Sequence, residues 1–134
     1  MQSNDLYAKF LPSWVWIIVV LQVGLVLFFS IGTALNPGAF IPGVTELNYV
    51  TQLYITRNVV VALGIVIALL LASHRALLLI LIVRLLTDVA DVISVYALDV
   101  EAIKSSVPMV VVLLILPATA AIGYLWSRSR RAAG

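Results

Sequence analysis

Long apolar stretches separated by short polar segments dominate this sequence. Four of them are long enough to cross a membrane as helices, because a span needs about 20 mostly apolar residues. They cover residues 14–35, 52–72, 76–98 and 107–126. The pattern predicts one integral membrane domain over residues 1–134, with an all-α fold in which four transmembrane helices form an antiparallel bundle.

The composition excludes several classes of protein. Hydrophobic residues make up 63% of the chain and charged residues 10%, whereas a soluble domain has roughly 45–50% and about 25%. The 8 basic and 6 acidic residues leave a small positive charge without a long basic run, so we expect a lipid bilayer as partner and no nucleic acid. With no cysteine and one histidine, we also expect no metal site and no cofactor.

Basic residues in the connecting segments predict the orientation. One side of the predicted bundle carries five of them, and the other side carries only Lys104. The five are Lys9, Arg75, Arg128, Arg130 and Arg131. Because loops rich in Lys and Arg stay in the cytoplasm, both termini are expected there.

The third apolar stretch has one polar face. On a helix its polar side chains form a stripe about 120° wide, made of Arg84, Thr87, Asp88, Asp91 and Ser94. Its three central charges cost on the order of 8–10 kcal/mol to insert, whereas its Leu, Ile and Val residues contribute about 4–8 kcal/mol. The stripe must therefore face polar partners rather than lipid.

The short turn between the second and third stretches makes them an antiparallel hairpin. In that hairpin Arg57 and Asp91 lie at equal depth, which predicts an ion pair between the two helices. Arg84 and Asp88 are spaced for a second pair within one helix. Gly64 lies opposite Arg84 and is expected to leave room for its side chain.

The first and fourth stretches also contribute polar groups. Gln22 lies inside the first, and Pro117 lies inside the fourth. A proline there kinks the helix and frees the carbonyl of Leu113. We expect this carbonyl and Gln22 to accept hydrogen bonds from Arg84, so that all four helices build one buried polar centre.

The segment over residues 36–44 contains two Pro–Gly pairs, which favour turns. Its apolar Phe40 and Ile41 are expected to fold back onto the helix ends. The segment is interpreted either as a connector resting in the membrane interface or as a lid.

The chain resembles the DoxX-like group of small four-helix bacterial membrane proteins, including members of unassigned function. The resemblance lies in Arg57 with Gly64 seven residues later, followed by the Arg–Asp stripe from Arg84 to Asp91. It covers nearly the whole chain. It implies a compact four-helix bundle in the bacterial inner (cytoplasmic) membrane. Members of the group sometimes act beside an oxidoreductase or as an accessory to another membrane protein, and the resemblance implies no catalytic residues.

Two interpretations of the polar centre follow. In one, it binds a small hydrophobic or amphipathic molecule in a protein that acts alone, as a homodimer or beside a larger membrane partner. The expected ligand-binding residues are Arg57, Asn58, Tyr54, Gln22 and Thr87. In the other, two arginines and two aspartates form a self-neutralised network that only fixes helix register.

Two further functions stay open. Asp88 and Asp91 could divide acid and base roles beside Arg84 and Arg57, as carboxylates with separated pKa values do. Such an intramembrane enzyme would suit epoxide hydrolysis, isomerisation or cyclisation of a hydrophobic substrate. An ion-coupled transporter would need a dimer, because one chain has too few helices for inverted repeats.

Overall fold

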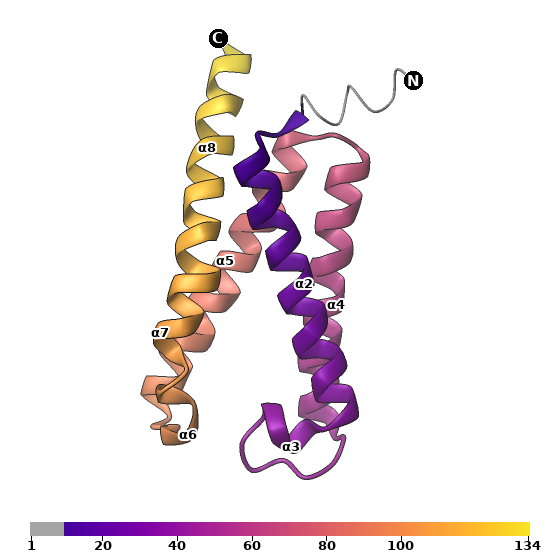
Figure 1. The fold of residues 1–134 in the computed structure, drawn as a ribbon, viewed down its shortest axis with the longest axis vertical. Coiled ribbons are helices and arrows are strands. Elements are labelled where there is room, and N and C mark those ends of the chain that lie inside the picture. Colours follow the sequence, from indigo (N-terminus) through magenta and orange to yellow (C-terminus); the bar gives the residue numbers. More distant parts are fainter. Residues whose placement is uncertain (1–9) are drawn as a thin grey trace.

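The structure of the chain is a computed structural model that describes residues 10–134, with only the backbone described for Ala133. Within this part of the chain every regular element is helical, which confirms the predicted all-α class (Figure 1). Lys9, one of the basic residues used to predict orientation, lies outside the described residues.

Long helices form most of the fold. They are α2 (Ser13–Leu35), α4 (Tyr49–Leu70), α5 (His74–Ala97) and a continuous segment made of α7 (Val107–Val110), the π-helical turn η1 (Val111–Ile115) and α8 (Leu116–Ala133). The short helices α3 (Pro37–Phe40) and α6 (Glu101–Lys104) lie in the connections. Three helical segments are long and apolar enough to cross a membrane, namely α2, α4 and Val107–Ala132. Helix α5 is as long, with 24 residues, but carries the charged stripe.

Side-chain caps define where α4 and α5 begin. The Thr51 N–H donates to Asn48 Oδ1 at 3.0 Å and the Asn48 N–H donates to Thr51 Oγ1 at 2.8 Å, which forms a capping box. The Ala76 N–H donates to Ser73 Oγ at 3.2 Å at the start of α5. Because Ala72 takes a left-handed conformation (φ 46°), the chain reverses direction at once, as the predicted hairpin requires.

The start of α2, the α4–α5 turn and the end of α8 lie together, and we call this the termini end; α3 and α6 lie at the opposite loop end (Figure 1). Helix α2 packs on α4, α5 packs on α8, and α4 packs on α5. The α2–α4 and α5–α8 pairs lie close at the termini end and diverge toward the loop end (Figure 1).

The hydrophobic core follows this arrangement, because its buried side chains come mainly from the termini-end halves of the long helices. They include Val15, Val19, Ile65, Leu77, Leu81, Ala121 and Leu125. The closed half of the molecule is therefore held together mainly by this apolar cluster.

Helix α3 folds back onto the loop end of α2. The Phe40 ring packs so closely on Gly32 that it leaves no room for a Cβ there. Its centroid lies 5.9 Å from that of Phe28 and 5.9 Å from that of Phe29. The predicted fold-back of Phe40 is confirmed, but Pro37 begins a short helix rather than a turn, since proline suits the first helical position.

Candidate functional site

A buried ion pair occupies the middle of α5. Arg84 Nη2 lies 2.8 Å from Asp88 Oδ1, and the two side chains are 6% and 5% exposed. Arg84 Nη1 also donates to Asn58 Oδ1 on α4 at 3.4 Å. The predicted pair within the third stretch is confirmed, and we call Arg84–Asp88 the buried pair. Asn58 connects it to the neighbouring helix.

The buried pair retains unused hydrogen-bonding capacity. Arg84 Nε and Asp88 Oδ2 are buried and have no hydrogen-bond partner among the described residues, and the same holds for Gln22 Oε1. A buried polar atom without a partner destabilises a fold by about 1–3 kcal/mol. Within the described part of the chain, buried polar atoms without a partner thus lie both at the buried pair and, separately, on α2.

A second ion pair joins α4 to α5 nearer the loop end. Arg57 donates two parallel hydrogen bonds to Asp91, from Nη1 to Oδ1 at 3.2 Å and from Nη2 to Oδ2 at 2.8 Å. The side chains are 37% and 48% exposed, and we call Arg57–Asp91 the half-exposed pair. The predicted interhelical pair is confirmed. The pair lies nearer the loop end than the buried pair does.

Tyr54 supports the half-exposed pair from one side. The Arg57 guanidinium carbon lies 5.5 Å from the centre of the Tyr54 ring, which is within the range of a cation–π contact. Two hydrogen bonds and the ring hold the guanidinium in one orientation.

Gln22 does not contact Arg84, contrary to the prediction. Its Nε2 donates to the Leu114 carbonyl at 3.0 Å, so it links α2 to η1. The predicted free carbonyl was that of Leu113, one residue earlier. Pro117 has no N–H and would crowd the preceding turn, and the chain responds with a π-helical turn in which the Leu116 N–H donates to the Val111 carbonyl. The acceptor of Gln22 is therefore the Leu114 carbonyl and not that of Leu113.

Gly64 does not face Arg84, which corrects a second expectation. A Cβ on Gly64 would lie 2.8 Å from Ile80 Cδ1. The Arg84 side chain instead contacts Asp88 and Asn58, which both lie nearer the loop end. The space at Gly64 therefore serves the packing of α4 on α5 and not the arginine.

Two hydroxyl side chains of the predicted stripe, those of Thr87 and Ser94, form hydrogen bonds within α5 itself. Thr87 Oγ1 donates to the Arg84 carbonyl at 2.7 Å, and Ser94 Oγ donates to the Ala90 carbonyl at 2.8 Å. Both bonds stay within α5, and Ser94 is exposed. Thr87 therefore lies near the ion pairs without donating its hydroxyl proton to them.

The structure thus divides the predicted site residues into three groups. Arg57, Tyr54 and Asp91 lie together, and Asn58, Arg84 and Asp88 form an adjacent group between the same two helices. Gln22 belongs to a separate contact between α2 and η1. The prediction that all four long helices build one polar centre is therefore wrong, because Gln22 hydrogen-bonds to η1 and not to Arg84.

Sequence reasoning missed two polar residues of α2. Ser30 and Thr33 are buried, with Ser30 Oγ donating to the Val26 carbonyl at 2.8 Å. Thr33 Oγ1 has no hydrogen-bond partner among the described residues. The helical spacing from Gln22 through Val26 to Ser30 and Thr33 places them on one face, and this spacing was the available signal.

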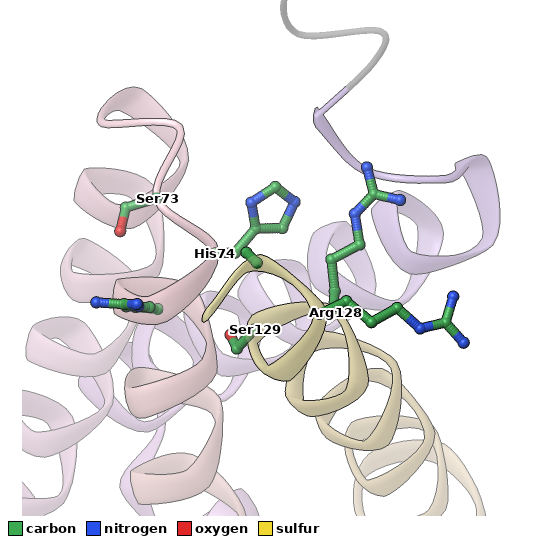
Figure 2. A pocket seen from close by; sticks show the side chains of 7 residues that line it. Ser73, His74, Arg128 and Ser129 are labelled. Atoms are coloured by element: carbon green, nitrogen blue, oxygen red, sulfur yellow. The ribbon is translucent and has the colours of Figure 1, made fainter. Parts of the chain in front are cut away.

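A pocket of about 520 Å³ lies at the termini end, between the start of α5 and the last turns of α8 (Figure 2). We call it the basic pocket, and its polar lining residues are Ser73, His74, Arg75, Arg128, Ser129 and Arg131. Its lining includes no predicted site residue. From the sequence its arginines were interpreted only as signals of orientation.

Comparisons with protein-family models, with curated proteins and with solved structures found no match to this chain. The assignment of a function therefore rests on the chain's own residues.

Proposed function

We propose that this protein is a four-helix bundle of the bacterial inner membrane that binds a small amphipathic molecule at the half-exposed pair. Both termini are cytoplasmic in this proposal. Membership of the DoxX-like group belongs to the same proposal, and it is supported by the Arg57 to Gly64 pattern and by the stripe on α5.

The length and packing of α5 support its crossing of the membrane. It has 24 residues, compared with 23 in α2 and 22 in α4, and it packs between α4 and α8. Its three central charges each have an ionic partner within 2.8 Å. Paired charges that face neighbouring helices are the form in which membrane spans tolerate them.

The exposure of the Arg57–Asp91 pair is the observation that carries the ligand proposal. Within the proposed membrane arrangement, side chains that are 37% and 48% exposed would meet hydrocarbon if nothing polar covered them. Contact between a charged group and lipid is unfavourable by several kcal/mol. A polar group of a bound molecule would remove that contact.

The chemistry of the pair indicates the class of molecule. The guanidinium and carboxylate together are neutral, so they favour a neutral head group over a charged one. Each Nη nitrogen of Arg57 carries a second N–H beyond its bond to Asp91, and this N–H can donate to a carbonyl or hydroxyl oxygen. Asp91 accepts hydrogen bonds from a hydroxyl. A long-chain alcohol or hydroxy-carbonyl compound fits this donor and acceptor set.

The proposal is tested with decanol as the probe and decane as its matched control without a head group. The unfolding temperature of the detergent-purified protein should rise with decanol concentration, because a ligand stabilises the state that binds it. Decane should give no comparable rise. In the Arg57→Leu/Asp91→Leu double variant, which leaves no unpaired charge, the decanol effect should disappear.

The control variant is Gln22→Leu, because it removes a buried polar side chain that contacts neither member of the pair. It should keep the response to decanol. An equal response in the double variant and the wild type would contradict the proposed site. Chemical conversion of a bound hydroxy-carbonyl probe would favour the acid/base enzyme instead.

The membrane arrangement has a separate test. A fluorescent reporter that matures only in the cytoplasm should be bright when it is fused to the C-terminus. A fusion that is active only outside the cytoplasm would contradict the orientation without bearing on the ligand.

A further inference from the structure

The basic pocket brings together two segments far apart in the sequence. Figure 2 shows Ser73 and His74 from the start of α5 on one side and Arg128 and Ser129 from α8 on the other. His74 is held in place because its Nε2 lies 2.8 Å from the Phe10 carbonyl oxygen and its ring lies 4.4 Å from that of Phe10. The wall on the α5 side is therefore fixed to the start of α2.

The charged residues that line the pocket are all basic. Three arginines line it, Arg75, Arg128 and Arg131, and its lining includes no acidic residue. Among the described residues none of these three forms an ion pair. Three arginines without an acidic neighbour in the lining make the cavity electropositive, and an anion there would be attracted to them.

Further hydrogen-bond donors belong to residues that line the same cavity. Ser129 lines the pocket, and its Oγ is buried without a hydrogen-bond partner among the described residues. The His74 and Arg75 amides belong to the first turn of α5, where N–H groups have no partner within the helix and favour anions. The pocket thus combines positive charge with a hydroxyl and backbone donors, which is the donor set that phosphate prefers.

The depth of the pocket indicates where the phosphate comes from. The rings of Trp14 and Tyr124 pack edge to face with centroids 5.5 Å apart, and Trp126 lies on the following turn of α8. Such aromatic residues mark the membrane–water interface. At a rise of about 1.5 Å per residue, Arg128 and Arg131 lie roughly 3–8 Å beyond Trp126, which is the level of lipid head groups.

We infer that the basic pocket binds the phosphate of an anionic phospholipid head group. This site is separate from the half-exposed pair, and the inference of an anion does not depend on the ligand proposed there. The lipid as the source of the phosphate does depend on the proposed membrane arrangement.

The test uses the full chain in a neutral detergent and short-chain lipids as probes. Dioctanoyl phosphatidylglycerol should raise the unfolding temperature in a saturable way. Dioctanoyl phosphatidylcholine carries the same phosphate beside a fixed positive charge, so it should bind at least about tenfold more weakly. Inorganic phosphate is the third probe and should bind more weakly than the phosphatidylglycerol.

Arg130 provides a matched control for Arg131. The two are adjacent and carry the same charge, but Arg130 lies outside the pocket lining and stacks on Trp126, with its guanidinium carbon 5.3 Å from the ring centre. Arg131→Gln should weaken phosphatidylglycerol binding about fivefold or more, which is the effect of about 1 kcal/mol per basic residue. Arg130→Gln should change it less than about twofold.

Each other outcome contradicts part of the inference. Equal losses for Arg131→Gln and Arg130→Gln would show diffuse attraction to the basic tail and would overturn the pocket. Equal binding of the two lipids would overturn anion recognition. Binding of inorganic phosphate without binding of phosphatidylglycerol would overturn the lipid as the source.

Discussion

Two ion pairs of the same chemical type differ chiefly in their surroundings. Asp88 and Asp91 lie one turn apart on α5, and each contacts an arginine at 2.8 Å. The buried pair is 6% and 5% exposed, whereas the half-exposed pair is 37% and 48% exposed. The half-exposed pair lies nearer the loop end, toward which the helix pairs diverge (Figure 1). A small change in depth thus separates a structural role from an accessible site.

Removal of one member should therefore destabilise the protein to a different extent in the two pairs. A buried charge without its partner has no solvent to stabilise it, so the loss of one member is severe. A half-exposed charge retains contact with its surroundings, and the loss is smaller. The following predictions test this difference, in order of expected effect.

The largest effect is expected for Asp88→Ala. It leaves the Arg84 guanidinium buried without a carboxylate, and the free energy of unfolding should fall by about 3–5 kcal/mol. Unfolding in a mixed-micelle titration measures it. The Arg84→Leu/Asp88→Leu double variant should recover much of the loss, because it removes both charges. A double variant as unstable as Asp88→Ala would show that the two charges are not coupled.

Arg57→Ala and Asp91→Ala should each destabilise the protein by about 0.5–2 kcal/mol, as polar contacts between membrane helices do. The double change to Ala should destabilise less than the sum of the single changes. Strict additivity would mean that the contact between Arg57 and Asp91 does not contribute to stability. A loss as large as that of Asp88→Ala would remove the distinction between the two pairs.

Gln22→Leu tests a neutral contact outside both pairs. It removes the hydrogen bond to the Leu114 carbonyl, and it also removes a buried oxygen that has no partner among the described residues. The expected loss is about 0.5–1.5 kcal/mol, which is typical of one hydrogen bond. An effect above that of Asp91→Ala would place the main polar contact of the fold at η1.

The smallest effect is expected at the loop end, where Lys104 contacts the exposed carboxylates of Asp99 and Glu101. These two carboxylates raise the pKa of Lys104 above its ordinary value. The sign of this shift means that any contribution is lost as pH rises through that raised pKa, and solvent screening keeps it too small to measure at neutral pH. Lys104→Gln should leave the unfolding temperature at neutral pH unchanged within error. A measurable loss there would contradict the rule that exposure sets the effect of an ion pair.

Much of the fold follows from the apolar pattern, and the exceptions have physical causes. Helix α4 begins at Tyr49 rather than at residue 52 because the polar Asn48 and Thr51 cap it. Helix α8 continues to Ala133 beyond the predicted residue 126. A helix that leaves the bilayer can continue in water with a polar sequence such as the tail after Trp126.

The two ion pairs were predictable because helical spacing and a short turn place charged residues together with little freedom. The contact of Gln22 was not, since it depends on how α2 packs against the π-helical turn η1. The basic pocket was not predictable either, because it forms only where the end of α8 approaches the start of α5. Such features depend on how separate helices meet, which hydropathy does not record.

The most direct test of the central claim is an experimental structure of the protein purified from its membrane, at a resolution that shows density between α4 and α5. We expect elongated density with its polar end at Arg57 and Asp91 and its remainder along the diverging helices. A structure in which protein side chains from the same chain or a second copy cover Arg57 and Asp91 completely would contradict it.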